Sequence, residues 1–127
     1  MGSPHNYTLY YFFYKSLYTS IIFRTFALAN WKNMLSIKHI ETERNGRFEA
    51  WLDAVHVGEL TYQRTTPERM IIDHTRVFEG FEGQGIARKL VMAAVDFARQ
   101  NNRLIIPVCS YARNVLTRTD EYKDILA

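Results

Sequence analysis

The most informative stretch of this 127-residue sequence for predicting the fold is Val77-Phe-Glu-Gly-Phe-Glu-Gly-Gln-Gly-Ile-Ala-Arg-Lys-Leu90. A β-branched strand pattern ends at Val77, a glycine-rich turn follows, and helical spacing begins at Ile86. The glycines are Gly80, Gly83 and Gly85. Glycine permits a tight turn and lets the backbone approach a ligand closely. The first amides of a helix lack internal acceptors and carry partial positive charge. The stretch therefore favours a phosphate or pyrophosphate at this turn.

The expected helix has one broad apolar face with the i, i+3, i+4 recurrence of an amphipathic helix. Its apolar residues are Ile86, Ala87, Leu90, Val91, Ala94, Val95, Phe97 and Ala98. The glycine spacing G-x-x-G-x-G is neither the G-x-G-x-x-G dinucleotide pattern nor a P-loop. A tight strand-to-helix turn without a ligand is the alternative interpretation.

Five strands and two helices account for the chain from Met34 onward. We expect strands at Leu35–Glu41, Arg47–Leu52, Val57–Tyr62, Met70–Phe78 and Leu104–Val108, and helices at Gly85–Gln100 and from Tyr111 to about Thr119. Asn45-Gly46 is a hairpin signal between the first two strands. The fold class is α/β (α+β): an antiparallel meander followed by one right-handed βαβ crossover. Pro107 marks an edge, a bulge or a place where two strands part.

The charge of the chain argues against nucleic-acid binding. The 16 basic and 13 acidic residues give a net charge of +3, but Lys15, Arg24 and Lys32 precede Met34, and the remainder is balanced. A basic stripe that could follow a phosphate backbone is absent from the sequence pattern. Cys109 is the only cysteine, so neither an internal disulfide nor a cysteine zinc cluster can form. A reducing, cytoplasmic compartment is the simplest setting.

Residues 1–33 differ in composition from the rest and hold ten of the eighteen aromatic residues. Lys15 and Arg24 interrupt their apolar run, which argues against a membrane span. A signal peptide fits poorly because no basic residue precedes the run. An amphipathic surface anchor remains an alternative. We expect an extension, added by a start codon upstream of Met34, that makes no membrane contact and lies outside a domain at residues 34–127.

Three motifs, His74–Val77, Gly83–Ala87 and Pro107–Tyr111, resemble in this order and spacing the small one-domain branch of the GNAT-type N-acetyltransferase superfamily. The resemblance extends from about Met34 to the end of the chain. It implies a minimal acyl-CoA N-acyltransferase fold, with acetyl-CoA as the acetyl donor and a small-molecule or protein amine as the acceptor. Fuller members have helices between their first two strands and a final strand pair. The Asn45-Gly46 hairpin leaves no room for these helices, and the chain is too short for the strand pair, which implies a shallow, open acceptor side.

The resemblance also assigns cofactor-binding residues. The main chain around Val77 and Phe78 would meet the pantetheine arm as an extra strand. The pyrophosphate would bind the backbone of Gly83, Gln84, Gly85, Ile86 and Ala87. Arg88 would add charge to the phosphates, whereas Lys89 is expected on a solvated helix face. The chain departs from the superfamily pattern at Gly80 and Glu82, and carboxylates at Glu79 and Glu82 weaken the attraction for phosphate.

Three residues are candidates for the chemistry. His74 is a candidate general base because imidazole titrates near neutral pH, and a structural histidine is the alternative. Strand alternation predicts that Asp73 faces the other side. Tyr111 corresponds to a superfamily tyrosine that protonates the CoA thiolate, with packing as its alternative role. Cys109 faces the thioester or is a small buried hydrophobe, and a covalent acetyl-cysteine route is the less favoured mechanism.

Three functions are therefore compared. The leading hypothesis is an acetyl-CoA-dependent N-acetyltransferase that moves an acetyl group directly to an exposed amine. The second is a non-catalytic CoA- or acyl-CoA-binding module. The third is an interaction domain that uses an exposed strand edge and binds no ligand. Binding of acetyl-CoA separates the third from the others, and thiol release with amine acceptors separates the first from the second.

Overall fold

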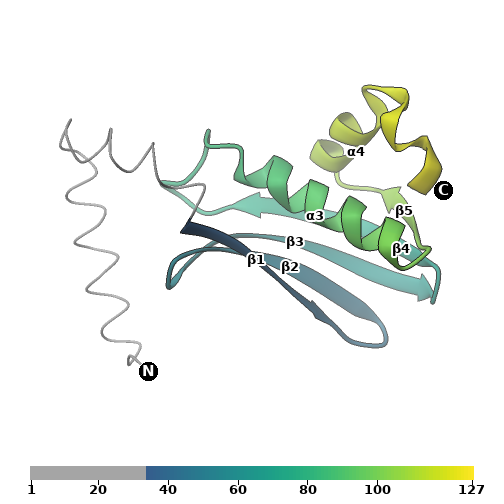
Figure 1. Ribbon diagram of the computed structural model, residues 1–127, viewed down its shortest axis with the longest axis horizontal. Coiled ribbons are helices and arrows are strands. Elements are labelled where there is room, and N and C mark those ends of the chain that lie inside the picture. Colours follow the sequence, from purple (N-terminus) through teal and green to yellow (C-terminus); the bar gives the residue numbers. More distant parts are fainter. Residues whose placement is uncertain (1–33) are drawn as a thin grey trace. The chain divides into compact units, whose positions relative to one another are not determined.

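A computed structural model describes residues 34–127 of the chain (Figure 1). The predictions for residues 1–33 (an extension, with a membrane span, signal peptide or surface anchor as alternatives) lie outside the described residues. Two compact units are distinguished. One consists of Ile37–Ala50 and Val57–Ala127, and the other includes residues 34–36 and 51–56. In the second unit the Asp53 amide donates to the Met34 carbonyl, and the rings of Trp51 and His56 stack with centroids 4.9 Å apart.

The sheet has five strands in the order of the sequence, β1-β2-β3-β4-β5. The strands are β1 (Leu35–Glu41), β2 (Asn45–Leu52), β3 (Val55–Thr66), β4 (Arg69–Val77) and β5 (Leu104–Pro107). β3 and β4 are antiparallel, whereas β5 runs parallel to β4 after the α3 crossover. The predicted meander with one crossover is confirmed. Parallel neighbours require such a crossover, because a short turn joins only antiparallel strands.

Helix α3 (Ile86–Gln100) lies along the sheet, while α4 (Ser110–Thr117) and the 3₁₀ helix η1 (Asp120–Ile125) gather beside β5 (Figure 1). Six of the residues predicted for the apolar face of α3 are buried: Ile86, Leu90, Val91, Ala94, Val95 and Ala98. α3 contacts β4 and β5, whose buried side chains include Met70, Ile72 and Ile105. The amphipathic period therefore predicts the packing face correctly. Among the described residues, no helix is long and apolar enough to cross a membrane.

The first hairpin forms where Asn45-Gly46 predicts one, but its turn lies at residues 42–44. The Thr42 amide donates to the Asn45 carbonyl over 2.8 Å, and the Asn45 amide donates to the Thr42 hydroxyl over 3.2 Å. Gly46 has a different function, because a Cβ atom there would lie 2.3 Å from the ring of buried Tyr62. Glycine is required at this position for packing rather than for the turn.

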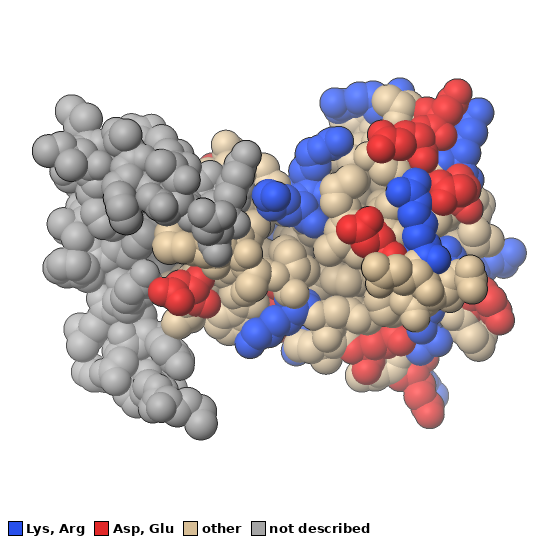
Figure 2. Space-filling model, viewed as in Figure 1, with Lys and Arg blue, Asp and Glu red and all other residues tan. Residues whose placement is uncertain are grey.

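Charged side chains of both signs are interspersed over the described residues on the face shown in Figure 2. Ion pairs connect these charges in this part of the chain, for example Arg99 with Asp124 at 2.9 Å and Arg47 with Glu49 at 2.8 Å. This mixed surface agrees with the balanced charge that the sequence has after Met34.

Candidate functional site

The glycine corner leads from β4 into α3 with its backbone in the left-handed region. Gly80, Gly83 and Gly85 have φ values of 93°, 77° and 78°. Only glycine adopts these values without strain, which explains why three glycines occupy the turn. Gly85 is the N-cap of α3 and supplies no side-chain acceptor. The first helical hydrogen bond runs from the Lys89 amide to the Gly85 carbonyl, so the amides before Lys89 are not used within the helix.

The corner fits an anionic group. A Cβ atom placed on Gly83 or Gly85 would have no atom within 4 Å, so both backbones border open space. No acidic residue lies in the first turn of α3, and Arg88 is exposed there. The carboxylate of Glu82 accepts a hydrogen bond from the Gly80 amide at 3.0 Å. Glu82 therefore binds its own loop and uses one amide of the corner.

β4 and β5 part beside this corner. Their pairing ends at Ile72 and Pro107, and the amides of Val108 and Cys109 both donate to the Ile72 carbonyl, over 3.0 and 2.9 Å. β4 continues to Val77, so no strand of the described chain pairs with its last residues on this side. Of the three sequence alternatives for Pro107, the structure selects the place where strands part. A free strand edge accepts an extended ligand arm through main-chain hydrogen bonds.

The two residues predicted to meet that arm differ in their backbone contacts. Val77 ends β4 opposite Gly58 of β3. The amide of Phe78 donates to the Val57 carbonyl over 2.8 Å, and the Phe78 carbonyl accepts from the Phe81 amide over 3.1 Å. The backbone of Phe78 is therefore already hydrogen-bonded within the chain, and Val77 is the more available of the two.

β4 contains a bulge that corrects the prediction for Asp73. His74 pairs with Thr61 and Ile72 pairs with Tyr62, so Asp73 is an extra residue on β4. Its carboxylate accepts hydrogen bonds from the Thr61 hydroxyl at 2.6 Å and the Gln63 side chain at 3.1 Å. Asp73 therefore lies on the same face as His74. Strand alternation predicts opposite faces, and this prediction is wrong because a bulge shifts the alternation by one residue.

His74 lies on the sheet face away from α3. A Cβ atom on Gly58 would lie 3.6 Å from Ile86 of α3, so Gly58 faces the helix. Leu60 faces the helix as well, because residues two apart on a strand lie on the same side of the sheet. Thr61, the partner of His74, faces the opposite side. A hollow of about 380 Å³ opens there and is lined by Glu59, Thr61, His74, Thr75 and Arg76.

Cys109 is the N-cap of α4 and lies beside β4, with its Sγ 3.6 Å from the Thr75 hydroxyl. Burial alone would raise the pKa of the thiol. Hydrogen bonds from the Ala112 amide, the Thr75 hydroxyl and the Tyr111 amide outweigh burial, and the pKa of Cys109 falls below its ordinary value. A lowered pKa increases the fraction of thiolate, the nucleophilic form.

Tyr111 is 39% exposed at the beginning of α4. It is thus not a core residue, which weighs against packing as its role. The guanidinium of Arg113 donates to the carbonyls of Pro107 and Val108, over 3.2 and 3.4 Å, and fixes the end of β5 that positions Cys109 and Tyr111. The sequence pattern alone does not identify this function for Arg113, because the contact depends on the first turn of α4.

The candidate residues form two groups rather than one. Cys109 and Tyr111 lie together where β5 leaves the sheet. His74 borders the hollow on the face away from α3, and within residues 34–127 no hydrogen bond joins it to either of them. The edge of β4 lies between the two groups, so a group bound along that edge would be approached from both sides.

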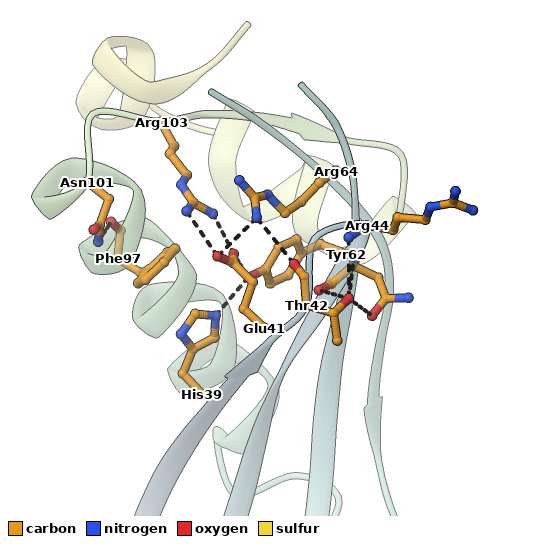
Figure 3. Close-up of polar contacts among 10 residues, drawn as sticks. His39, Glu41, Thr42, Arg44, Tyr62, Arg64, Phe97, Asn101 and Arg103 are labelled. Atoms are coloured by element: carbon orange, nitrogen blue, oxygen red, sulfur yellow. Dashed lines mark hydrogen bonds and ion pairs between the residues drawn. The ribbon is translucent and has the colours of Figure 1, made fainter. Parts of the chain in front are cut away.

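A polar cluster lies at the opposite end of α3 and is shown in Figure 3. We call Glu41, Tyr62, Arg64 and Arg103, with His39, the Glu41 cluster. Both terminal nitrogens of the Arg103 guanidinium donate to the Glu41 carboxylate, Nη2 over 3.0 Å, and Arg64 donates to it over 3.3 Å. Tyr62 donates its hydroxyl proton to Glu41, so its oxygen accepts from His39 Nε2 at 2.7 Å.

Electrostatics in the Glu41 cluster follow from these contacts. Burial would raise the pKa of Glu41, but hydrogen bonds from Arg103 and Tyr62 outweigh it and lower the pKa. Burial and the neighbouring carboxylate raise the pKa of Tyr62. Burial lowers the pKa of His39, whose ring stacks on Phe48 with centroids 4.3 Å apart. α3 has 15 residues and is about 22 Å long, so this cluster is remote from the glycine corner.

The sequence of residues 47–125 matches the profile of a protein family described as GCN5-related N-acetyl-transferase. Among solved structures, the chain is similar to a GCN5-like protein from Staphylococcus aureus, at 36% identity and a TM-score of 0.57. That match covers 74% of this chain and 89% of the other. No curated protein shows significant similarity to the sequence.

Two more distant structures share the fold. A GNAT family acetyltransferase from Elizabethkingia anophelis, solved with acetyl-CoA bound, is 13% identical with a TM-score of 0.54, over 68% of this chain and 74% of its own. An IAA acetyltransferase from Bacillus cereus is 20% identical with a TM-score of 0.53, over 66% of this chain and 73% of its own.

Proposed function

The chain belongs to the GCN5-related N-acetyltransferase family, and we propose that it transfers an acetyl group from acetyl-CoA directly to an exposed amine. Residues 34–127 carry this activity, in a cytoplasmic setting that suits a chain with a single cysteine. The observation that carries the proposal is the glycine corner beside the free edge of β4. Open helix amides and an unpaired strand edge are adjacent, and together they match a ligand with a pyrophosphate and an extended arm.

Each part of the site has one task. The backbone of Gly83–Ala87 holds the pyrophosphate, with Arg88 adding positive charge, and the β4 edge as far as Val77 aligns the pantetheine arm. Acetyl-CoA supplies a thioester carbonyl as the acetyl donor. Fixing donor and acceptor in a reactive orientation accounts for much of the rate gain in such transfers.

Two proton transfers complete the reaction. His74, on the side of the hollow, takes a proton from the acceptor in its ammonium form, which frees the nitrogen lone pair for attack. The exposed hydroxyl of Tyr111, at the end of β5, returns a proton to the departing sulfur. The lowered pKa of Cys109 keeps a second route available, in which its thiolate accepts the acetyl group first.

The experiment has two parts. Calorimetry with acetyl-CoA tests for a binding site, and spectroscopic detection of free thiol in the presence of primary amines tests for turnover. We expect binding together with amine-dependent thiol release. Binding without thiol release from any amine would instead identify a CoA-binding module, and absence of binding would contradict both functions.

A further inference from the structure

The hollow on the sheet face away from α3 is lined by residues that can form hydrogen bonds with a ligand. Glu59, Thr61, His74, Thr75 and Arg76 line it, and none of these side chains is apolar. His74 and Arg76 are exposed, so the hollow is reached from solvent. The carboxylate of Glu59, the imidazole of His74 and the guanidinium of Arg76 are groups with which a polar ligand can form hydrogen bonds.

Asp73 adds an uncompensated negative charge at the rim of this hollow. Thr61 both lines the hollow and donates to the Asp73 carboxylate at 2.6 Å, so the two are adjacent. The second donor to Asp73 is the neutral amide of Gln63. Within residues 34–127, no lysine or arginine forms an ion pair with Asp73.

The other charges at the hollow offset each other. Arg76 pairs with Glu59 at 3.5 Å and lies 5.1 Å from the centre of the Phe78 ring. Burial would raise the pKa of Asp73, but the hydrogen bonds from Thr61 and Gln63 outweigh it and keep the pKa below its ordinary value. The Asp73 carboxylate is therefore charged at neutral pH and lies next to Thr61, which lines the hollow.

We propose that this hollow is the acceptor site and that it takes a hydrophilic primary ammonium group, which Asp73 binds and His74 deprotonates. The proposal rests on the proposed acetyltransferase function. The bulge in β4 makes it possible, because it turns both residues toward the same face. Asp73 is the positioning residue. Its lowered pKa suits it to hold a cation and makes it a weak base.

The steps balance in protons and bonds. The ammonium group enters with its positive charge against the Asp73 carboxylate and gives one proton to the His74 imidazole. The neutral amine forms the new C–N bond as the C–S bond of the thioester breaks. The sulfur takes a proton from Tyr111, and the second proton of the attacking nitrogen passes through solvent back to the Tyr111 oxygen. The secondary amide product leaves as a neutral group that Asp73 no longer attracts.

The test uses binding, so it does not depend on turnover. Full-length ¹⁵N-labelled protein with saturating CoA is titrated with cadaverine, a primary diamine, and separately with 1,5-pentanediol, its neutral analogue. We expect cadaverine to shift the amide signals of Thr61, Asp73 and His74, and pentanediol to leave them unchanged. Asp73→Asn keeps the size and the Thr61 contact but loses the charge, and it should weaken cadaverine binding roughly tenfold or more.

The matched control is Asp96→Asn, which removes an exposed carboxylate from α3 and should leave cadaverine binding unchanged. Equal cadaverine affinity in Asp73→Asn and wild type, or equal shifts with pentanediol, would overturn the proposal. Absence of cadaverine shifts would do the same. If CoA itself shifts the glycine corner in these samples, the proposed function stands even when the acceptor site fails.

Discussion

The two ends of α3 differ in whether the chain itself provides hydrogen-bond partners for the terminal backbone groups. Every helix ends with backbone groups that have no partner inside the helix. At the carboxyl end the chain satisfies them itself: the Asn101 amide and side chain both donate to the Phe97 carbonyl, and the Arg103 amide donates to the Ala98 carbonyl over 2.8 Å. At the amino end Gly85 provides no side-chain cap. The amide donors at the amino end of α3 that the helix itself does not use are therefore available to a ligand.

Side chains repeat this contrast. The carboxyl end adjoins the Glu41 cluster, in which two guanidiniums, a tyrosine and a histidine are connected through one carboxylate. The glycine corner has almost no side chains close to its backbone. We infer that one end of α3 stabilises the fold and the other binds the ligand, and substitutions should separate the two properties.

The largest expected effect is on stability, from Glu41→Ala. The change leaves the guanidiniums of Arg64 and Arg103, whose side chains are 16% and 14% exposed, without their carboxylate. Stranding largely buried charges should lower the free energy of unfolding by about 3 kcal/mol, measured by urea denaturation. Acetyl-CoA affinity should stay within about twofold, because the ligand binds the other end. Glu43→Ala, in the exposed turn nearby, is the control and should change little.

The next effect is on binding, from Gly85→Val. A branched side chain at this position enters the open space that the ligand needs, and we expect acetyl-CoA affinity to fall about 10²-fold in calorimetry. The positive φ of 78° also strains valine by about 1–3 kcal/mol. Asn102→Val is a matched control, because Asn102 has a φ of 53° just beyond the carboxyl end of α3. It should lose similar stability and keep its affinity. Equal binding losses in both variants would show that strain, not the corner, is responsible.

A third prediction separates binding from chemistry and concerns the two residues at the beginning of α4. Tyr111→Phe should lower turnover by roughly 10- to 100-fold with unchanged acetyl-CoA affinity, because only the departing sulfur loses its proton donor. Cys109→Ala should have a smaller effect, as direct transfer needs no enzyme nucleophile. Mass spectrometry of the protein after incubation with acetyl-CoA provides the check. Acetylated Cys109 together with an inactive Cys109→Ala would demonstrate the two-step route instead.

The smallest effect concerns pH and the Glu41 cluster. Burial lowers the pKa of His39; Glu41 raises this pKa and Arg103 lowers it, and the net shift is downward. His39 therefore becomes protonated at a higher pH in the unfolded chain than in the folded chain. Stability should therefore decline as pH falls below the ordinary histidine value of 6.5. His39→Gln should flatten this slope in urea titrations between pH 7 and 5, and an unchanged slope would exclude His39 as its source. The decline from Glu41, whose pKa is also lowered, begins below its ordinary value of 4.5.

Local patterns predicted most of the fold. The apolar face of α3 follows from residue spacing, and the parallel β5 follows from the crossover that α3 makes. For Pro107 the sequence left three alternatives, and the parting of strands is one of them. The glycine corner was predictable because it depends on neighbouring residues. Glycine residues indicate positions that can adopt positive φ values, and all three glycines of the corner adopt them.

Contacts between distant residues were not predictable in this way. Gly46 looks like a turn residue, yet its absent side chain makes room for Tyr62. The Glu41 cluster joins residues from β1, β3 and the end of α3. The bulge at Asp73 cannot be recognised in a single sequence, because it depends on the register between β4 and β3. Because of the bulge, the Asp73 side chain lies on the face opposite to the one that strand alternation predicts.

The most direct test of the difference between the ends of α3 is an acetyl-CoA titration of ¹⁵N-labelled protein followed by NMR. We expect large amide shifts at Gly83–Ala87 and along β4 up to Val77, and no shifts for the amides of Asn101–Arg103. Shifts concentrated at the carboxyl end of α3, or no shifts at the glycine corner, would contradict this expectation.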